Sequence, residues 1–239
     1  MLRRIQLPVT LLLLLSVNGF ANNALLDAMQ NNTVIKAGWQ LYIKGDYPGA
    51  LSAWRPLAEQ GSPQAQFIMG YMYAHGTGVE KSLSRCADWY RKAADQGLAA
   101  AQNNLGLMYF RGHGVKQNPK KAMYWFAKAA KQGNIQAQTS LGTMFALGEG
   151  VGRNYFLAFE WFYRAATEGY AQAQINLGLM YANGKGVSQD FDDAIKWFNR
   201  AARNGHPDAD RFIQEMYDLK AKNAPRVIPP PLYFVPKFG

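Results

Sequence analysis

Glycine and tryptophan return every 36 residues along this chain of 239 residues, and that period constrains the fold more than any other feature. The recurring residues form three series: Gly70, Gly106, Gly142 and Gly178; Trp89, Trp125, Trp161 and Trp197; and Gly61, Gly97, Gly133, Gly169 and Gly205. A period of this length is typical of a solenoid, in which one supersecondary unit stacks on the next. We therefore expect an all-α chain of stacked antiparallel helix pairs.

Four complete repeats occupy residues 62–97, 98–133, 134–169 and 170–205. In the second, residues 101–109 have helical spacing, Gly112-His113-Gly114-Val115 interrupts it, and residues 120–132 resume it. Paired glycines adopt backbone angles that other residues resist, and Gly133 fits the left-handed residue that ends a helix. Each repeat is thus predicted to be a helical hairpin.

Side-chain size at the repeated positions indicates a packing role. Ala101 and Gly106 allow close approach of helices, Trp125-Phe126 fills wider gaps, and Met108 fills what remains. A stripe of methionine and aromatic residues at helical spacing favours a core over a cofactor site. We expect no cofactor.

The two ends of the chain depart from the repeat, as capping units do. Residues 37–61 are predicted to form an atypical N-terminal hairpin after a lead segment at 22–36, and residues 206–222 a C-terminal capping helix. The tail at 223–239 contains Pro229-Pro230-Pro231, so we expect it to be extended. Its apolar end would dock on its own solenoid or on a partner.

The N-terminus has the order of a secretory signal peptide. Arg3 and Arg4 precede an apolar run at 7–17, and small residues lead to Ala21, so we expect residues 1–21 to be removed. The alternative, an uncleaved anchor, needs an apolar run of roughly 20 residues. The sequence therefore predicts export, to the periplasm or outside the cell, with no membrane span in the mature chain.

The net charge of +10 is locally concentrated. The repeat at 98–133 has six cations and no acidic residue: Arg111, Lys116, Lys120, Lys121, Lys128 and Lys131. Such a patch is usual for nucleic acid, but export argues against that partner, so an anionic glycan, a lipid head group or an acidic protein fits better. A solvated face that only aids solubility is the alternative.

Residues 171–202 carry Ala-x-Ala-Gln, Leu-Gly-x-Met-Tyr, Gly-x-Gly-Val, Trp and Ala-Ala in fixed order, and in this the chain resembles Sel1-like repeat proteins. That family belongs to the tetratricopeptide-like solenoids. The resemblance implies a right-handed α-solenoid and a protein-interaction adaptor or scaffold, which in exported bacterial members serves the cell envelope.

The resemblance also implies a partner-binding groove on the first helix of each repeat, lined by a face that varies between repeats. The expected face suits an extended peptide or a partner helix, although some of its members would pack on the preceding repeat. Its members are Phe67, Tyr71 and His75; Asn103, Leu107, Phe110 and Arg111; Thr139, Thr143 and Leu147; and Ile175, Leu179 and Asn183.

Motifs that carry chemistry are absent from the sequence. It has no His-Glu-x-x-His, no Gly-x-Ser-x-Gly and no phosphate-binding loop, and its one cysteine, Cys86, stands where other repeats have alanine. We expect no catalytic or metal site, and an adaptor rather than an enzyme. Binding of an anionic cell-wall polymer is the first alternative, and a cell-wall-related enzyme is the second. The oligomeric state is left open.

Overall fold

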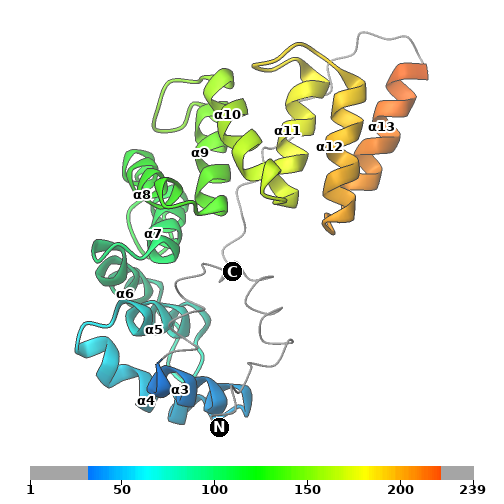
Figure 1. The fold of residues 1–239 in the computed structure, drawn as a ribbon. Coiled ribbons are helices and arrows are strands. Elements are labelled where there is room, and N and C mark those ends of the chain that lie inside the picture. Colours follow the sequence, from blue (N-terminus) through cyan, green and yellow to red (C-terminus); the bar gives the residue numbers. More distant parts are fainter. Residues whose placement is uncertain (1–31, 222–239) are drawn as a thin grey trace. The chain divides into compact units, whose positions relative to one another are not determined.

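A computed structural model describes residues 32–221, which form eleven α-helices with no strand in that range (Figure 1). The predicted signal peptide, most of the lead segment and the proline-rich tail lie outside the described residues. The chain divides into two compact units, one ending at Ala129 and the other beginning at Ala130. The boundary falls inside one helix, and the two units are described separately below.

The first unit contains the N-terminal hairpin and two repeats. Its helices are α3 (Thr33–Ile43), α4 (Tyr47–Glu59), α5 (Pro63–His75), α6 (Leu83–Asp95), α7 (Ala99–Arg111) and the start of α8 (Pro119–Lys131). Each helix from α3 to α6 contacts the next in the chain. Helix α3 begins at Thr33, within the predicted lead segment, because Asn32 caps it by accepting from the backbone N–H groups of Val34 and Ile35.

The second unit contains two further repeats and a final helix. Its helices are α9 (Ile135–Leu147), α10 (Tyr155–Thr167), α11 (Ala171–Asn183), α12 (Phe191–Arg203) and α13 (Ala209–Ala221). Consecutive helices again contact each other, and α13 covers α12 through the stacked rings of Phe212 and Phe198, whose centroids are 5.2 Å apart. The predicted all-α solenoid of stacked hairpins is confirmed in each unit.

The glycine pair in each turn has two separate functions. Gly112 ends α7 in the left-handed conformation (φ 74°), and its N–H bonds the carbonyl of Met108. Gly114 also has positive φ, and a Cβ there would collide with the backbone carbonyl of Leu83 in the preceding repeat. The second glycine therefore lets successive repeats stack with backbone against backbone.

The aromatic pair on the second helices divides between core and margin. The second member of the pair is fully buried in every repeat: Tyr90, Phe126, Phe162 and Phe198. The tryptophan before it lies at the edge of the core, where a lysine or arginine three residues later covers its ring at 4.2–5.1 Å in the four repeats. The second aromatic residue therefore fills the core of the repeat, while the face of the tryptophan ring also contacts a cation.

A buried glutamine joins successive repeats through backbone carbonyls. The amides of Gln66, Gln102 and Gln174 donate to the carbonyls of Ala58, Ala94 and Ala166, at 3.0–3.1 Å, in the hairpin before each. A second amide then donates to the glutamine oxygen: Gln96 to Gln66 at 2.8 Å, and Asn204 to Gln174 at 3.0 Å. These bonds satisfy a buried polar group and fix the spacing of neighbouring hairpins.

None of the described helices is apolar over a length that would cross a bilayer.

Candidate functional site

Most of the predicted groove residues are buried. The structure places eight of the thirteen inside the solenoid, where a ligand cannot touch them without rearrangement: Phe67, Asn103, Leu107, Phe110, Thr139, Thr143, Ile175 and Leu179. Each first helix lies between two others, as α5 does between α4 and α6 and α11 between α10 and α12, and its buried residues extend around most of its circumference. In α7, for example, every residue from Ala99 to Phe110 except Asn104 is buried.

The five remaining groove residues keep accessible surface and lie at the C-terminal part of the first helices. In the first unit they are Tyr71, His75 and Arg111, and in the second they are Leu147 and Asn183. The His75 ring lies on that of Tyr71 with centroids 4.0 Å apart, and its Nδ1 is 3.0 Å from the Tyr71 carbonyl oxygen. The Asn183 amide donates to the Leu179 carbonyl at 2.8 Å.

Four of these accessible residues occupy one repeat position. His75, Arg111, Leu147 and Asn183 are each the last residue of a first helix, directly before the left-handed glycine. Partial burial lowers the pKa of the Arg111 guanidinium from its ordinary value, although the group stays charged at neutral pH. An imidazole, a guanidinium, an isobutyl group and an amide thus replace one another on the same backbone.

The structure distributes the predicted basic patch over three elements. Arg111 ends α7, Lys116 lies in the turn, and Lys120, Lys121, Lys128 and Lys131 are exposed on α8. Lys121 covers the Tyr109 ring at 5.3 Å, and Lys128 lies over Tyr124 and Trp125 at 4.6 and 5.1 Å. Two of the six cations thus lie against aromatic rings.

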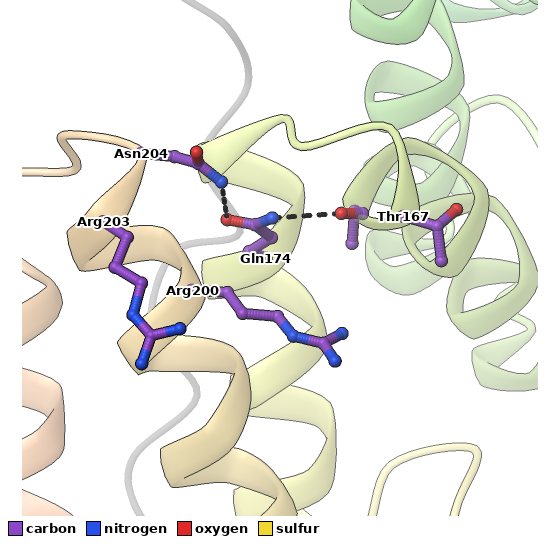
Figure 2. A pocket seen from close by; sticks show the side chains of 6 residues that line it. Thr167, Gln174, Arg200, Arg203 and Asn204 are labelled. Atoms are coloured by element: carbon purple, nitrogen blue, oxygen red, sulfur yellow. Dashed lines mark hydrogen bonds between the residues drawn. The ribbon is translucent and has the colours of Figure 1, made fainter.

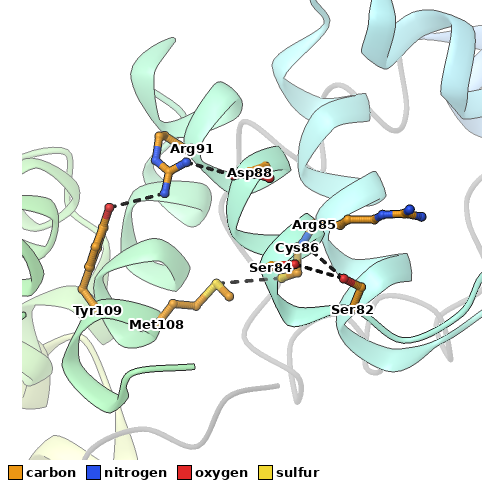
Figure 3. A network of polar contacts seen from close by, with 8 residues as sticks. All are labelled: Ser82, Ser84, Arg85, Cys86, Asp88, Arg91, Met108 and Tyr109. Carbon is orange, nitrogen blue, oxygen red and sulfur yellow. Dashed lines mark hydrogen bonds and ion pairs between the residues drawn. The ribbon is translucent and has the colours of Figure 1, made fainter. Parts of the chain in front are cut away.

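Two of the predicted cations line an open pocket of about 410 Å³ in the first unit. Lys116 and Lys121 are joined there by Arg91, which was not among the predicted site residues. Arg91 donates to the Tyr109 hydroxyl at 3.4 Å and pairs with Asp88 at 3.0 Å, as Figure 3 shows. The hydrogen bond to Tyr109 and the ion pair with Asp88 raise the Arg91 pKa. No acidic side chain lines this pocket.

A second open pocket of about 410 Å³ lies in the second unit, and none of its lining residues was among the predicted site residues. Arg200 and Arg203 of α12 line it together with the joining amides Gln174 and Asn204 and the end of α10 at Thr167 (Figure 2). The signal that was missed is a pair of arginines three residues apart in the last turn of a second helix.

The described residues contain no group of three or more His, Cys, Asp or Glu side chains placed to hold a metal ion. His75 packs on Tyr71, His113 lies exposed in a turn, and the His206 ring contacts the Gln172 side chain at 3.3 Å. Burial lowers the His206 pKa. The three histidines belong to three different repeats or their caps.

The comparisons with known proteins agree with this architecture. The family described as Sel1 repeat matches residues 63–98, 99–134, 135–170 and 171–206. A Sel1 repeat protein from Oxalobacter formigenes is 37% identical over 77% of this chain and 76% of that chain, with a TM-score of 0.73. No match was found among curated proteins.

Two further solved structures share the fold. The protein c5321, a protective antigen present in uropathogenic Escherichia coli strains, is 33% identical over 84% of this chain, with a TM-score of 0.71. The match covers 44% of that chain, so this protein spans less than half of it. A putative Sel1 repeat protein from Klebsiella pneumoniae, 17% identical with a TM-score of 0.51 over 80% of this chain and 95% of that one, shows the fold alone.

Sel1 repeat proteins are generally scaffolds for protein interactions, and the family is typically not catalytic. Four matched repeats cover more than half of this sequence, and the same repeats form the stacked hairpins of both units. The chain belongs to the Sel1 repeat family.

Proposed function

We propose that this protein is an exported scaffold of the cell envelope that binds a protein partner through the accessible ends of its first helices. The family supports a role in protein interaction. Export is supported by the N-terminal sequence alone, in which two arginines, an apolar run and small residues follow in the order of a signal peptide.

The observation that carries the proposal is the repeat position filled by His75, Arg111, Leu147 and Asn183. The glycine that follows is fixed by backbone geometry, and the residues before it are fixed by burial. The side chain at this position belongs to a different chemical class in every repeat, while the backbone of the helix end stays the same. Packing therefore does not determine which residue stands there, and recognition of a partner is a reason for the difference.

The proposal is tested by crosslinking in the envelope followed by capture of the tagged full-length protein. His75→Glu combined with Arg111→Glu should remove the captured partner, because both changes put a negative charge on accessible positions of the first unit. Ser84→Glu combined with Arg85→Glu is the control, since it changes the charge equally on the exposed side of α6. Its acids lie in the first helical turn, where they favour the helix. Equal capture by the two double variants would contradict the proposal.

Export has its own test, which does not depend on the partner. The mature protein recovered from the envelope should begin at Asn22, as read from the mass of its N-terminal peptide. Recovery of the intact N-terminus from the cytoplasm would refute export and leave the partner-binding surface untouched.

The pocket at Arg91, Lys116 and Lys121 favours a second candidate function, the binding of an anionic glycan. Three cations from three elements line the pocket, two of them in contact with the Tyr109 side chain, and no acid lines it. Retention on immobilised heparin should fall when Lys116 and Lys121 are both changed to Gln, and should weaken as salt increases. Lys44→Gln combined with Lys81→Gln, two exposed lysines outside the pocket, is the control. Unchanged retention of the Lys116 and Lys121 variant would exclude this function.

A further inference from the structure

We infer that the pocket formed by Arg200 and Arg203 binds carboxylate side chains of an acidic peptide segment in a protein partner. The inference rests on the proposed function in one respect, which is that the ligand is a protein. It names a separate site in the second unit and the chemistry that the site recognises.

The shape of the pocket is set by bonds that join two successive hairpins. The Gln174 amide donates to the Ala166 carbonyl at 3.0 Å and accepts from the Asn204 amide at 3.0 Å, as Figure 2 shows. The Thr167 hydroxyl is bonded to carbonyls of its own helix, at 2.8 and 3.1 Å. These polar neighbours are already held in place, so the two guanidinium groups supply most of the donors for a ligand.

The charge of the pocket is positive and uncompensated among the residues that line it. Arg200 and Arg203 are exposed and one helical turn apart, and the lining contains no Asp or Glu. Acids elsewhere in this part of the chain pair with other cations: Asp193 with Lys196, Asp192 with Lys220, and Asp208 and Glu215 with Arg211. Glu168 follows Thr167 in the sequence but does not line the pocket. In the described part of the chain neither pocket arginine forms an ion pair.

The equivalent place in the first repeat shows that the fold does not require an arginine at the position of Arg203. There Gln96 donates to Gln66 and Gln66 donates to Ala58, which repeats the frame of Asn204, Gln174 and Ala166. In place of Arg203 and Thr167, however, that corner has the acids Asp95 and Glu59. Lys92 stands in the place of Arg200, so one frame carries one cation and two acids in the first repeat and two cations without an acid in the last. Cations at a helix C-terminus favour the helix dipole, but only by about 0.3–1 kcal/mol.

The chemistry of the groups selects the ligand. A guanidinium presents parallel N–H donors that match the two oxygens of a carboxylate, and two arginines a turn apart can each take one carboxylate of a short acidic run. The Arg200 group lies over the Trp197 ring at 4.3 Å, which restrains its position and adds an apolar flank. Fixed donors beside an aromatic ring suit an acidic peptide better than a free inorganic anion.

Binding of fluorescein-labelled hexaglutamate to the full-length protein, followed by fluorescence anisotropy at about 0.15 M salt, tests the inference directly. Arg200→Gln combined with Arg203→Gln should raise the Kd at least about tenfold, the loss expected from removing charged hydrogen bonds. Arg200→Lys with Arg203→Lys keeps the charge but removes the paired donors, and should still raise the Kd about threefold or more.

The matched control is Arg153→Gln with Lys185→Gln, which removes two charges from the same unit at side chains that both lie over the Tyr155 ring. This variant should bind hexaglutamate as the unchanged protein does, and circular dichroism should show that all variants are folded. An equal loss in the control, or no binding by the unchanged protein, would overturn the inference.

Two competing ligands complete the test. Inorganic phosphate or heparin that displaces the peptide at lower concentration than unlabelled hexaglutamate would assign the pocket to a phosphate or a glycan, and would overturn the inference.

Loss of captured partner in the His75 and Arg111 variant concerns the other unit of the chain. The scaffold proposal and the acidic-peptide site can therefore fail independently.

Discussion

Gly106 of α7 faces the ring of Phe126 on α8 so closely that a Cβ on the glycine would lie 2.7 Å from both Cδ1 and Cε1 of the ring. The same contact joins Gly70 to Tyr90, Gly142 to Phe162 and Gly178 to Phe198, with hypothetical distances of 2.5–2.7 Å to the same two ring atoms. Each aromatic ring is fully buried. The absence of one methyl group is thus what allows the two helices of a hairpin to approach.

Gly106→Ala should destabilise the protein by about 1–3 kcal/mol, because the ring would have to move within a filled core. Chemical denaturation followed by circular dichroism measures the change. Gly152→Ala is the matched control, since a Cβ there meets nothing within 4 Å and the backbone angle at Gly152 is not in the left-handed region. Adding Phe126→Leu to Gly106→Ala should recover part of the loss. A loss equal to that of Gly152→Ala would refute the contact.

The repeat made this part of the structure predictable. The hairpins, the glycine turns and the small residues opposite aromatic ones follow from a 36-residue pattern in which each position recurs four times. The groove was less predictable, because the face that varies between repeats was expected to be accessible, whereas the first helices are buried around most of their circumference. Leu107 and Leu179 lie on the face predicted for a ligand, but that face is covered by the stack.

The pocket at Arg200 and Arg203 was missed for a different reason. Its residues come from two hairpins, and the two arginines look like ordinary surface cations in the sequence. Only the Gln174 and Asn204 bonds show that they belong to one corner. Periodicity explains the positions that are equal between repeats, whereas a site depends on positions that differ.

Leu179→Ala should destabilise the protein by about 2–5 kcal/mol, because the side chain is fully buried in the core formed with Phe198 and Phe212. His75→Ala, at an exposed position of the same predicted groove, should change stability by less than about 0.5 kcal/mol. Thermal and denaturant unfolding of both variants compares the two. Similar small effects would show that the Leu179 position is accessible after all.

Gln138 has a buried side-chain oxygen without a hydrogen-bond partner. In the equivalent places Gln66 and Gln174 accept from Gln96 and Asn204, but the third repeat has Glu168 at that donor position. An ionised carboxylate cannot donate a hydrogen bond.

Glu168→Gln should therefore stabilise the protein by about 1 kcal/mol, since it supplies the missing donor. The reciprocal change, Gln96→Glu, should destabilise it by a similar amount, because it removes the donor to Gln66. Both are measured by denaturant unfolding at neutral pH. An unchanged midpoint for Glu168→Gln, with a normal loss for Gln96→Glu, would show that the third repeat satisfies Gln138 in another way.

Cys86 should be chemically protected for as long as the protein is folded. It is fully buried, its thiol lies 3.8 Å from the Met108 sulfur, and burial raises its pKa from 9.0 to about 12. The thiolate is the reactive form, so a thiol reagent at pH 8 should label the native protein far more slowly than the protein in denaturant. Rapid labelling of the native protein at pH 8 would contradict the buried position of the thiol.

The same burial makes the free energy of unfolding depend on pH. Because the pKa of Cys86 is higher in the folded state, the stability that the neutral thiol contributes is complete below about pH 9 and falls as the pH rises toward 12. Cys86→Ala, which copies the residue at this position in the other repeats, should reduce that alkaline loss.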